Sequence, residues 1–170
     1  MGLGSSLRRR ARSARRSSSL TPPLGRFKDL RLPINNNEGP TITGIELQAR
    51  REALGLSQVA LAKALSVAQT TVSRWESGAS RVPSGVVEEL LHMEARVERL
   101  IDRMIVAAEE KFEQGEDVIL FVHRDDEAFG RVHPESDGMP AVFQRVAAAR
   151  ARLELADDGI DATIVAADYE

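Results

Sequence analysis

A stretch of 23 residues, Leu56–Gly78, limits what this chain can fold into more than any other part of it. It predicts two short helices joined by a tight turn. Ser57 stands before the first helix, where its hydroxyl can accept a hydrogen bond from an otherwise unpaired backbone amide. The apolar residues of this helix follow a helical spacing that predicts one buried face: Val59, Leu61, Ala62 and Leu65. Two helices this short must pack on each other and on flanking helices to be stable.

The second helix has few apolar residues, and Val72 and Trp75 are the ones expected to face its neighbours. The polar residues between and before them are predicted to point outward: Gln69, Thr70, Ser73 and Arg74. Gln can pair with the edge of an adenine and Arg with that of a guanine, while Thr and Ser can meet bases or phosphates. This combination favours nucleic-acid recognition over a helical hairpin that is merely packed.

Three motifs in register extend this interpretation: Leu-Ser-Gln, then Leu-Ala, then Val-Ser-Arg-Trp-Glu-x-Gly. They resemble the helix-turn-helix of the Cro and phage-repressor (XRE-type) family over about residues 44–83. The resemblance implies base contacts from Gln69, Thr70 and Arg74, with Ser73 at the margin. It also implies a phosphate contact from Gln58 and an ion pair between Arg51 and Glu76. Ser66 departs from the family, which usually has Gly there, and a turn that needs positive φ costs Ser more than Gly.

The loop after the second helix contains two further candidates for phosphate contacts, Ser80 and Arg81. For Arg81 a solvated loop charge is an equal alternative. The partner that these residues imply is double-stranded DNA.

Charge is distributed unevenly along the 170 residues, although the net charge is only −3. Residues 1–37 carry a net +8, residues 44–81 a net +2, and residues 82–170 a net −12, with nine basic and 21 acidic groups. Phosphate would repel the acidic C-terminal half, so the parts of the chain expected to approach nucleic acid are the helix-turn-helix region and the basic N-terminus.

The first 41 residues are predicted to be a disordered basic segment. Six arginines between residues 8 and 16 alternate with Ser and Ala, and a Pro-, Gly- and Asn-rich stretch follows. The segment can be read as an arm that contacts phosphates, as a transit peptide, or as an over-extended gene start. A twin-arginine signal would need an apolar segment after the arginines, and residues 17–25 lack one.

The remaining elements are predicted from periodicity. A first helix over Gly44–Leu54, capped by Thr43 with Glu46 three residues later, should bury Ile45, Leu47 and Leu54. A long helix should cover Val86–Phe112 and end near Gly115, with Leu91 and Phe112 in its apolar stripe. Further along, the pattern predicts a strand at Val118–Val122 and a loop at Arg124–Gly138. It then predicts a helix at Pro140–Ala156 and a strand candidate at Ile160–Ala166. The helix should have its apolar residues on one side: Val142, Phe143, Val146, Ala149 and Leu153. Two strands are too few for an independent sheet, so they should pair across a dimer or pack on the long helix.

Together these segments predict a mainly α fold with three parts. Residues 1–41 form the basic segment, residues 42–82 a lambda-repressor-like helix-turn-helix bundle, and residues 83–170 a long linking helix with a small α+β dimerisation domain. The motif Trp75-Glu76-Ser77-Gly78, followed by Ser80, Val82-Pro83, the long helix and the helix-and-strand tail, resembles the anti-CRISPR-associated autoregulators, which are dimeric repressors of phages and bacteria. That resemblance implies a homodimer that binds an inverted-repeat operator and represses its own operon. The expected dimer contacts lie on the long helix: Leu100, Ile101, Met104 and Ile105.

Two other classes of function remain open. An antitoxin would use the same DNA-binding head and a tail that neutralises a toxin. An enzyme would need a site such as His123, Asp125 and Asp126 at a strand end, with His133 and Glu135 nearby, but their spacing matches no known metal-ligand set. We therefore expect no enzyme activity, metal or cofactor. The chain has no cysteine and no apolar run of membrane length, which fits a cytoplasmic, nucleoid-associated protein.

Overall fold

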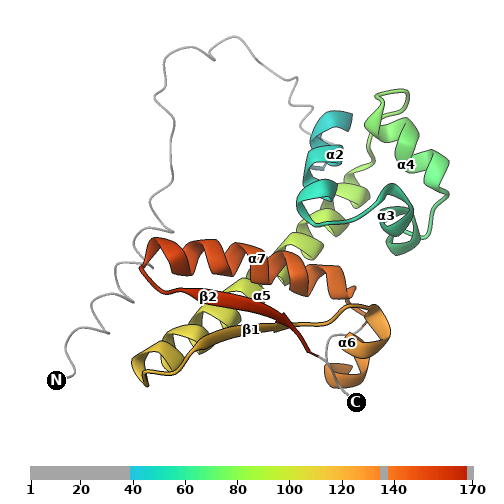
Figure 1. The fold of residues 1–170 in the computed structure, drawn as a ribbon. Coiled ribbons are helices and arrows are strands. Elements are labelled where there is room, and N and C mark those ends of the chain that lie inside the picture. Colours follow the sequence, from blue (N-terminus) through green and yellow to red (C-terminus); the bar gives the residue numbers. More distant parts are fainter. Residues whose placement is uncertain (1–38, 135–137, 168–170) are drawn as a thin grey trace, which may run out of the picture. The chain divides into compact units, whose positions relative to one another are not determined.

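The computed structural model describes residues 39–134 and 138–167. Its elements follow in the order α2 (Gly44–Ala53), α3 (Gln58–Ala64), α4 (Gln69–Glu76), α5 (Ser84–Glu113), β1 (Val118–Val122), α6 (Asp126–Val132), α7 (Ala141–Asp157) and β2 (Ala162–Ala166) (Figure 1). The described part is therefore mainly helical, with a helix-turn-helix region followed by a two-stranded sheet, as predicted. The segment predicted to be disordered lies almost entirely outside the described residues.

Side-chain caps start the first two helices where the sequence predicts them. The Thr43 hydroxyl accepts a hydrogen bond from the backbone N–H of Glu46 at 3.2 Å, and the Ser57 hydroxyl accepts one from the N–H of Ala60 at 3.0 Å. Each bond satisfies a donor that the helix itself cannot pair. Both caps are confirmed, and they fix where α2 and α3 begin.

The turn between α3 and α4 contains a residue in the left-handed region. Ser66 has φ 55°, and it is the only non-glycine residue with positive φ among those described. This is the conformation for which glycine is favoured, so the geometry of the turn is kept although Ser replaces Gly. Gly78 has φ 75° beyond the end of α4, a conformation typical of the glycine that follows a helix.

The buried face of the first three helices consists of Leu47, Leu61, Ala62, Val72 and Trp75. Two predicted members of it are wrong. Ile45 is 69% exposed and Val59 is 65% exposed. Each lies near the start of a short helix, where the neighbouring helices do not cover every position of the expected stripe.

Gly44 begins α2 in close contact with the end of α4. A Cβ atom at this position would lie 2.2 Å from the carbonyl oxygen of Trp75 and 2.6 Å from that of Glu76. Backbone atoms cannot yield as a flexible side chain can, so only glycine permits this approach.

Gly44→Ala should therefore lower the free energy of unfolding by about 2 kcal/mol, the usual cost of forcing an extra carbon into a packed site. Thermal or urea unfolding would measure the loss. Gly85→Ala is the matched control, because a Cβ atom at Gly85 would meet nothing within 4 Å. Equal stability of the two variants would show that α2 can move away from α4 at little cost.

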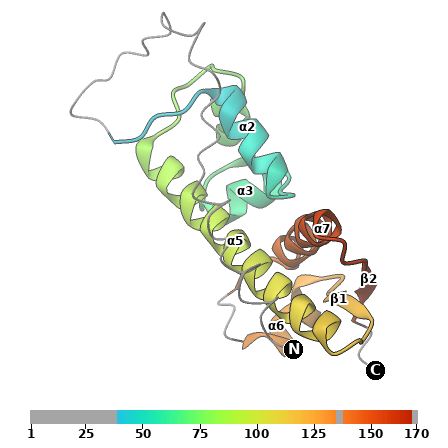
Figure 2. The ribbon, with the colours of Figure 1, turned by 90° about the vertical axis from the view of Figure 1, so that its left-hand side faces the viewer.

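The long helix α5 has 30 residues and is confirmed. Figure 2 shows it running from beside α2 and α3 toward the sheet. Its buried side includes Val87, Val97, Ile101 and Ala108. Leu91 and Phe112, which the sequence assigns to the same stripe, are exposed.

The two strands pair with each other in parallel, within one chain. Val118 is opposite Ala162, and the register continues to Val122 opposite Ala166. Helices α5 and α7 both contact the sheet, and the inward side chains of β1 are buried. The sheet thus packs on the long helix, which was one of the two predicted arrangements. The second strand begins two residues later than predicted.

Two predictions about the C-terminal half are wrong. The segment expected to be a loop contains helix α6, which begins because the Asp125 carboxylate accepts a hydrogen bond from the N–H of Ala128 at 2.8 Å. In α7 the buried face is formed mainly by alanines together with Phe143 and Leu155, whereas Ala149 and Leu153 are exposed. Small side chains let α7 lie close to α5 and the sheet, and a search for large apolar residues overlooks such a face.

The four residues expected at a dimer contact lie mostly inside the chain. Leu100, Ile101 and Ile105 are buried, and Met104 is partly buried. This chain covers the first three itself, so any effect of them on association would have to act through the packing of α5. Their role in a dimer remains a prediction.

Candidate nucleic-acid interface

Helix α4 presents the predicted base-contacting residues on one side. Gln69, Thr70 and Arg74 are exposed, and Ser73 is partly buried. Val72 and Trp75 are buried on the opposite side and hold the helix on its neighbours. The helix therefore offers a polar surface from a packed base, which is the arrangement needed for a helix that enters a DNA groove.

A hydrogen bond between two glutamines joins α3 to this surface. The side-chain amide nitrogen of Gln69 donates to the Oε1 atom of Gln58 at 2.6 Å. The amide nitrogen of Gln58 donates in turn to the Oε2 atom of Glu76 at 2.8 Å. Gln58 thus uses both ends of its amide, and it holds the Gln69 side chain at the start of α4.

The chain of hydrogen bonds ends in a buried ion pair. Arg51 Nε lies 2.6 Å from Glu76 Oε1, and Arg51 Nη2 lies 3.1 Å from Glu76 Oε2. The Nη1 atom of Arg51 also donates to the carbonyl oxygen of Leu56 at 2.7 Å. Only 8% of the Arg51 side chain and 4% of the Glu76 side chain are exposed. This pair ties α2 to the end of α4 and to the loop before α3.

The environment of Glu76 favours its charged form. Burial by itself would raise the pKa of the carboxyl, but the hydrogen bonds from Arg51 and Gln58 outweigh burial and lower the pKa. The bond to Glu76 likewise raises the pKa of the Arg51 guanidinium. Both groups are therefore charged at neutral pH, and the network from Arg51 to Gln69 stays connected.

The other two phosphate candidates follow α4 directly. The N–H of Ser80 donates to the carbonyl oxygen of Arg74 at 3.1 Å, which places this loop against the end of the helix. Ser80 is partly buried and Arg81 is exposed. The geometry brings them beside the same helix as the predicted base contacts, while Gln58 lies at the start of α3.

Sequence reasoning missed the contacts that connect these residues. It predicted that Gln58 contacts a phosphate and Gln69 a base, but no feature of the sequence indicated that these two glutamines, eleven positions apart, would form a hydrogen bond with each other. It also missed the pair between Arg50 and Glu94, in which two hydrogen bonds of 2.7 and 2.6 Å join α2 to α5.

The residues considered for an enzyme site have structural partners. Asp125 caps α6, and the Asp126 carboxylate accepts a hydrogen bond from the N–H of Ala141 at 2.8 Å. His123 is buried, with its Nδ1 atom 2.9 Å from the Oε1 atom of Gln144. Glu135 lies outside the described residues. Among those that the structure describes, no three His, Asp or Glu side chains are grouped so that they could hold a metal ion.

The turn, the two short helices packed against their neighbours and the exposed polar face of the second define a helix-turn-helix. Residues 43–102 match a family model described as a helix-turn-helix domain, of the XRE/Cro-like kind. The match supports a DNA-binding regulator. It ends within α5, and no curated protein matches the chain. No helix in residues 39–134 and 138–167 has the length and apolar character required to cross a membrane.

Proposed function

We propose that this protein is a sequence-specific transcriptional regulator that binds an inverted-repeat operator as a homodimer and represses its own operon. The observation that carries the proposal is the exposed face of α4, where Gln58 holds Gln69 in place. A side chain that is held before binding loses less conformational entropy on contact with a base. Such pre-organisation suits recognition better than it suits a packing role.

In this proposal α4 enters the major groove. Gln69 and Arg74 read base edges, Thr70 meets a base or a phosphate, and Ser73 lies at the margin. Gln58, Ser80 and Arg81 meet the phosphates on either side and set the position of the helix. The ion pair of Arg51 with Glu76 does not contact DNA in this proposal, but it supports α4 by keeping α2 and α4 at a fixed separation.

Gln69→Ala and Arg74→Ala should each weaken binding to the operator by about 1–3 kcal/mol and relax the preference at one base position. The reason is that each side chain presents hydrogen-bonding atoms that fit one base edge. Binding titrations against the operator and against single-base variants of it would measure both effects. Undiminished operator affinity of Arg74→Ala at moderate salt would contradict the placement of α4 in the groove.

Gln58→Ala distinguishes a simple phosphate contact from a positioning role. A phosphate contact alone would weaken all DNA sequences equally. Because Gln58 also holds Gln69, we expect the variant to lose part of the base preference that Gln69→Ala loses. Gln48→Ala is the control, since the Gln48 amide bonds to Glu52 on the surface of α2. A uniform loss of affinity on all sequences would leave Gln58 with the phosphate role alone.

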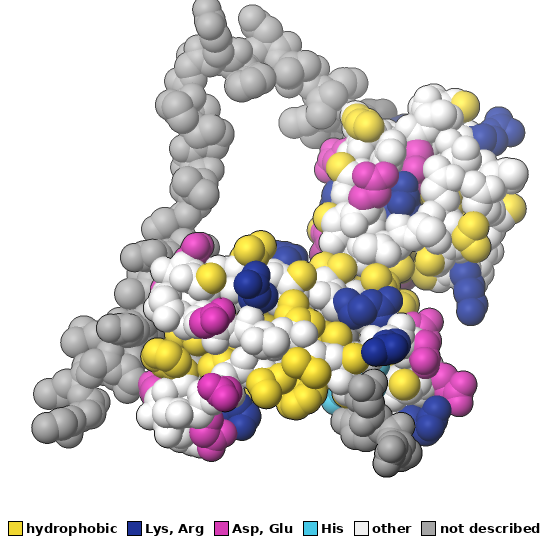
Figure 3. Space-filling model, viewed as in Figure 1, with side chains coloured by type: hydrophobic (Ala, Val, Ile, Leu, Met, Phe, Trp, Pro, Cys, Tyr) yellow, Lys and Arg dark blue, Asp and Glu magenta, His cyan; other side chains and the backbone are white. Residues whose placement is uncertain are grey.

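The homodimer is supported by an apolar surface in the C-terminal half. On the side of the sheet away from α5 and α7, Ile119 and Phe121 of β1 and Val165 of β2 are exposed. Hydrophobic side chains gather over the sheet in Figure 3. A two-stranded sheet with an open apolar face is marginal alone, and a second copy would cover it. One recognition helix also reads too few base pairs for a useful specificity ratio.

Repression of its own operon rests on the resemblance to the anti-CRISPR-associated autoregulators. Footprinting the purified protein on the DNA upstream of its own gene tests it directly. We expect two protected half-sites about 34–36 Å apart, one DNA turn between centres. The absence of a protected site there would refute autorepression. An antitoxin would instead be recognised by a neighbouring toxin gene whose product binds the tail.

A further inference from the structure

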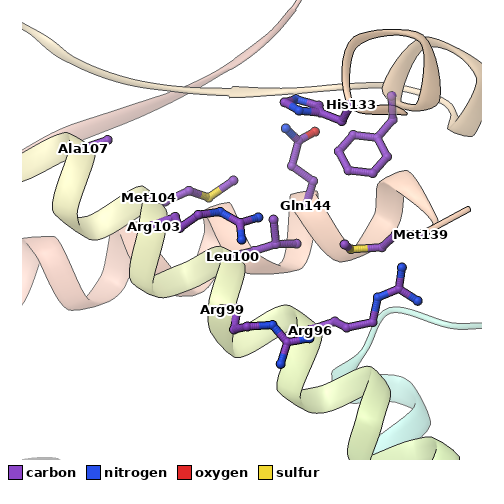
Figure 4. A pocket seen from close by; sticks show the side chains of 10 residues that line it. Arg96, Arg99, Leu100, Arg103, Met104, Ala107, His133, Met139 and Gln144 are labelled. Carbon is purple, nitrogen blue, oxygen red and sulfur yellow. The ribbon is translucent and has the colours of Figure 1, made fainter. Parts of the chain in front are cut away.

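A cavity of about 770 Å³ opens beside the middle of α5, toward α6 and the start of α7. Figure 4 shows three arginines of α5 among its lining residues, together with Leu100, Met104 and Met139. Pockets that hold small molecules have volumes of about 300–1,000 Å³, a mostly apolar lining and a few placed polar groups. This cavity has the size and the mixed lining of such a pocket.

The three arginines follow the spacing of a single helix face. Arg96, Arg99 and Arg103 are three and four positions apart, so they project from successive turns on the same side of α5. The surrounding residues 82–170 carry a net charge of −12, which makes this concentration of positive charge an exception within the C-terminal half. In the described part of the chain, neither Arg99 nor Arg103 forms an ion pair.

Glu94 and Glu98, two carboxylates of α5 close to this cluster, are paired with arginines that do not line the cavity. Glu94 binds Arg50 at 2.6 Å, and Glu98 binds Arg150 at 2.6 Å. These two carboxylates therefore do not neutralise Arg99 or Arg103, and the guanidinium groups of these two arginines remain available to an external anion.

A buried amide adds a donor that is independent of the arginines. Gln144 lines the cavity and is only 6% exposed. Its Oε1 atom accepts a hydrogen bond from the backbone N–H of His123 at 2.9 Å. A backbone N–H can only donate, so the oxygen is fixed on that side and the amide nitrogen faces the other way. The Gln144 nitrogen, Arg99 and Arg103 all offer hydrogen-bond donors to the cavity, and a ligand there would supply the acceptors.

We propose that this cavity binds a small organic anion, in which a phosphate or carboxylate group is joined to an apolar or planar body. The guanidinium groups of Arg99 and Arg103 and the Gln144 amide bind the anionic end, because charge-assisted hydrogen bonds to phosphate or carboxylate are the strong ones. Leu100, Met104 and Met139 cover the apolar part. A nucleic-acid strand fits less well, since its backbone offers no apolar part to this lining and the net charge around the cavity repels a polyanion.

The test uses the full chain and calorimetric titration with 1-naphthyl phosphate. The matched probes are 1-naphthol, which lacks the charge, inorganic phosphate, which lacks the apolar body, and 1-naphthoate, which carries a carboxylate instead. We expect saturable binding of 1-naphthyl phosphate or 1-naphthoate that is tighter than that of the other two. Whichever of these two anions binds more tightly indicates whether the natural ligand carries a phosphate or a carboxylate group.

Arg99→Gln and Arg103→Gln should each weaken that binding by about tenfold. Arg131→Gln is the control with the same change of charge, because Arg131 pairs with Glu127 on α6 and does not line the cavity. Gln144→Glu keeps an acceptor for His123 and replaces the inward amide by a carboxylate oxygen, so it should weaken binding at least as much. The melting temperature of each variant shows whether it is folded.

Three results would overturn the proposal. One is the absence of saturable binding of either naphthyl anion to the folded protein. Another is an equal loss of binding in Arg131→Gln and in Arg103→Gln. The third is a loss of DNA or RNA binding in Arg99→Gln and Arg103→Gln with unchanged binding of the small anions, which would assign the arginines to nucleic-acid phosphates.

Discussion

Glu76→Gln should lower the free energy of unfolding by about 3 kcal/mol, although it exchanges only one heavy atom. The substitution keeps the shape of the side chain but removes the charge that Arg51 faces. Arg51 would then remain buried with its bond to the Leu56 carbonyl and a longer contact to Glu52. A buried charge without its partner is the expensive state, and urea unfolding of the two proteins would measure the difference.

Glu94→Gln is a matched control for this prediction. Its partner Arg50 also makes two hydrogen bonds of 2.7 and 2.6 Å, so the geometry is as good as that of the inner pair. The difference is exposure, which is 21% for the Arg50 side chain and 31% for that of Glu94. Because water can solvate the Arg50 guanidinium that loses its partner, we expect the free energy of unfolding to fall by about 1 kcal/mol or less. Equal losses in the two variants would show that burial does not set the cost.

The same pair gives the stability a defined dependence on pH. The folded pKa of Glu76 lies below its ordinary value of 4.5, so its ionised form stabilises the fold fully above that value. This contribution is lost as pH falls through the lowered folded pKa. The gap in stability between the native protein and Glu76→Gln should therefore be constant from neutral pH to about 5 and shrink below 4.5. A gap that widened toward low pH would contradict the charged state assigned to Glu76.

The helix-turn-helix was predictable from sequence because its signals are local. A capping hydroxyl three residues before the amide it accepts from, such as Thr43 or Ser57, is visible in the sequence itself. The strand Val118–Val122 was equally visible as an apolar run, and its bounds were predicted without error. The long α5 followed from a period sustained over many turns. In each case the residues that decide the structure lie within a few positions of one another.

The predictions that failed depend on partners that are distant in sequence. Whether Ile45 or Val59 is covered depends on how far the neighbouring helices extend, and no local pattern records that. The buried face of α7 consists mainly of alanines, which allow close packing. A prediction that places the buried face where the large apolar residues lie therefore misplaces part of it. For the candidate site, the types of residue were readable, whereas the bond from Gln69 to Gln58 exists only once α3 and α4 have packed.

Phe121→Asp should convert the proposed homodimer into a monomer and lower operator affinity by about 100-fold or more. In the dimer, binding of one subunit to its half-site holds the other subunit near the second half-site, and the monomer loses this advantage. Phe121 is 55% exposed on the outer face of the sheet, where Val165 lies opposite it in the register. A charge there would have to be buried against the second copy without a partner. In the separate chain it stays in water, so the fold should survive.

Sedimentation at micromolar concentration would measure the state of association, and titration of an inverted repeat would measure the affinity. Leu153→Asp is the matched control, because Leu153 is also an exposed apolar residue but belongs to α7 and not to the sheet. It should remain dimeric and bind the operator as the native protein does. Ile101→Asp would not serve, since Ile101 is fully buried in the chain and the change would disrupt α5 itself. A native protein that sediments as a monomer and still binds the full operator tightly would defeat the dimer, and a dimeric Phe121→Asp would move the interface away from the sheet.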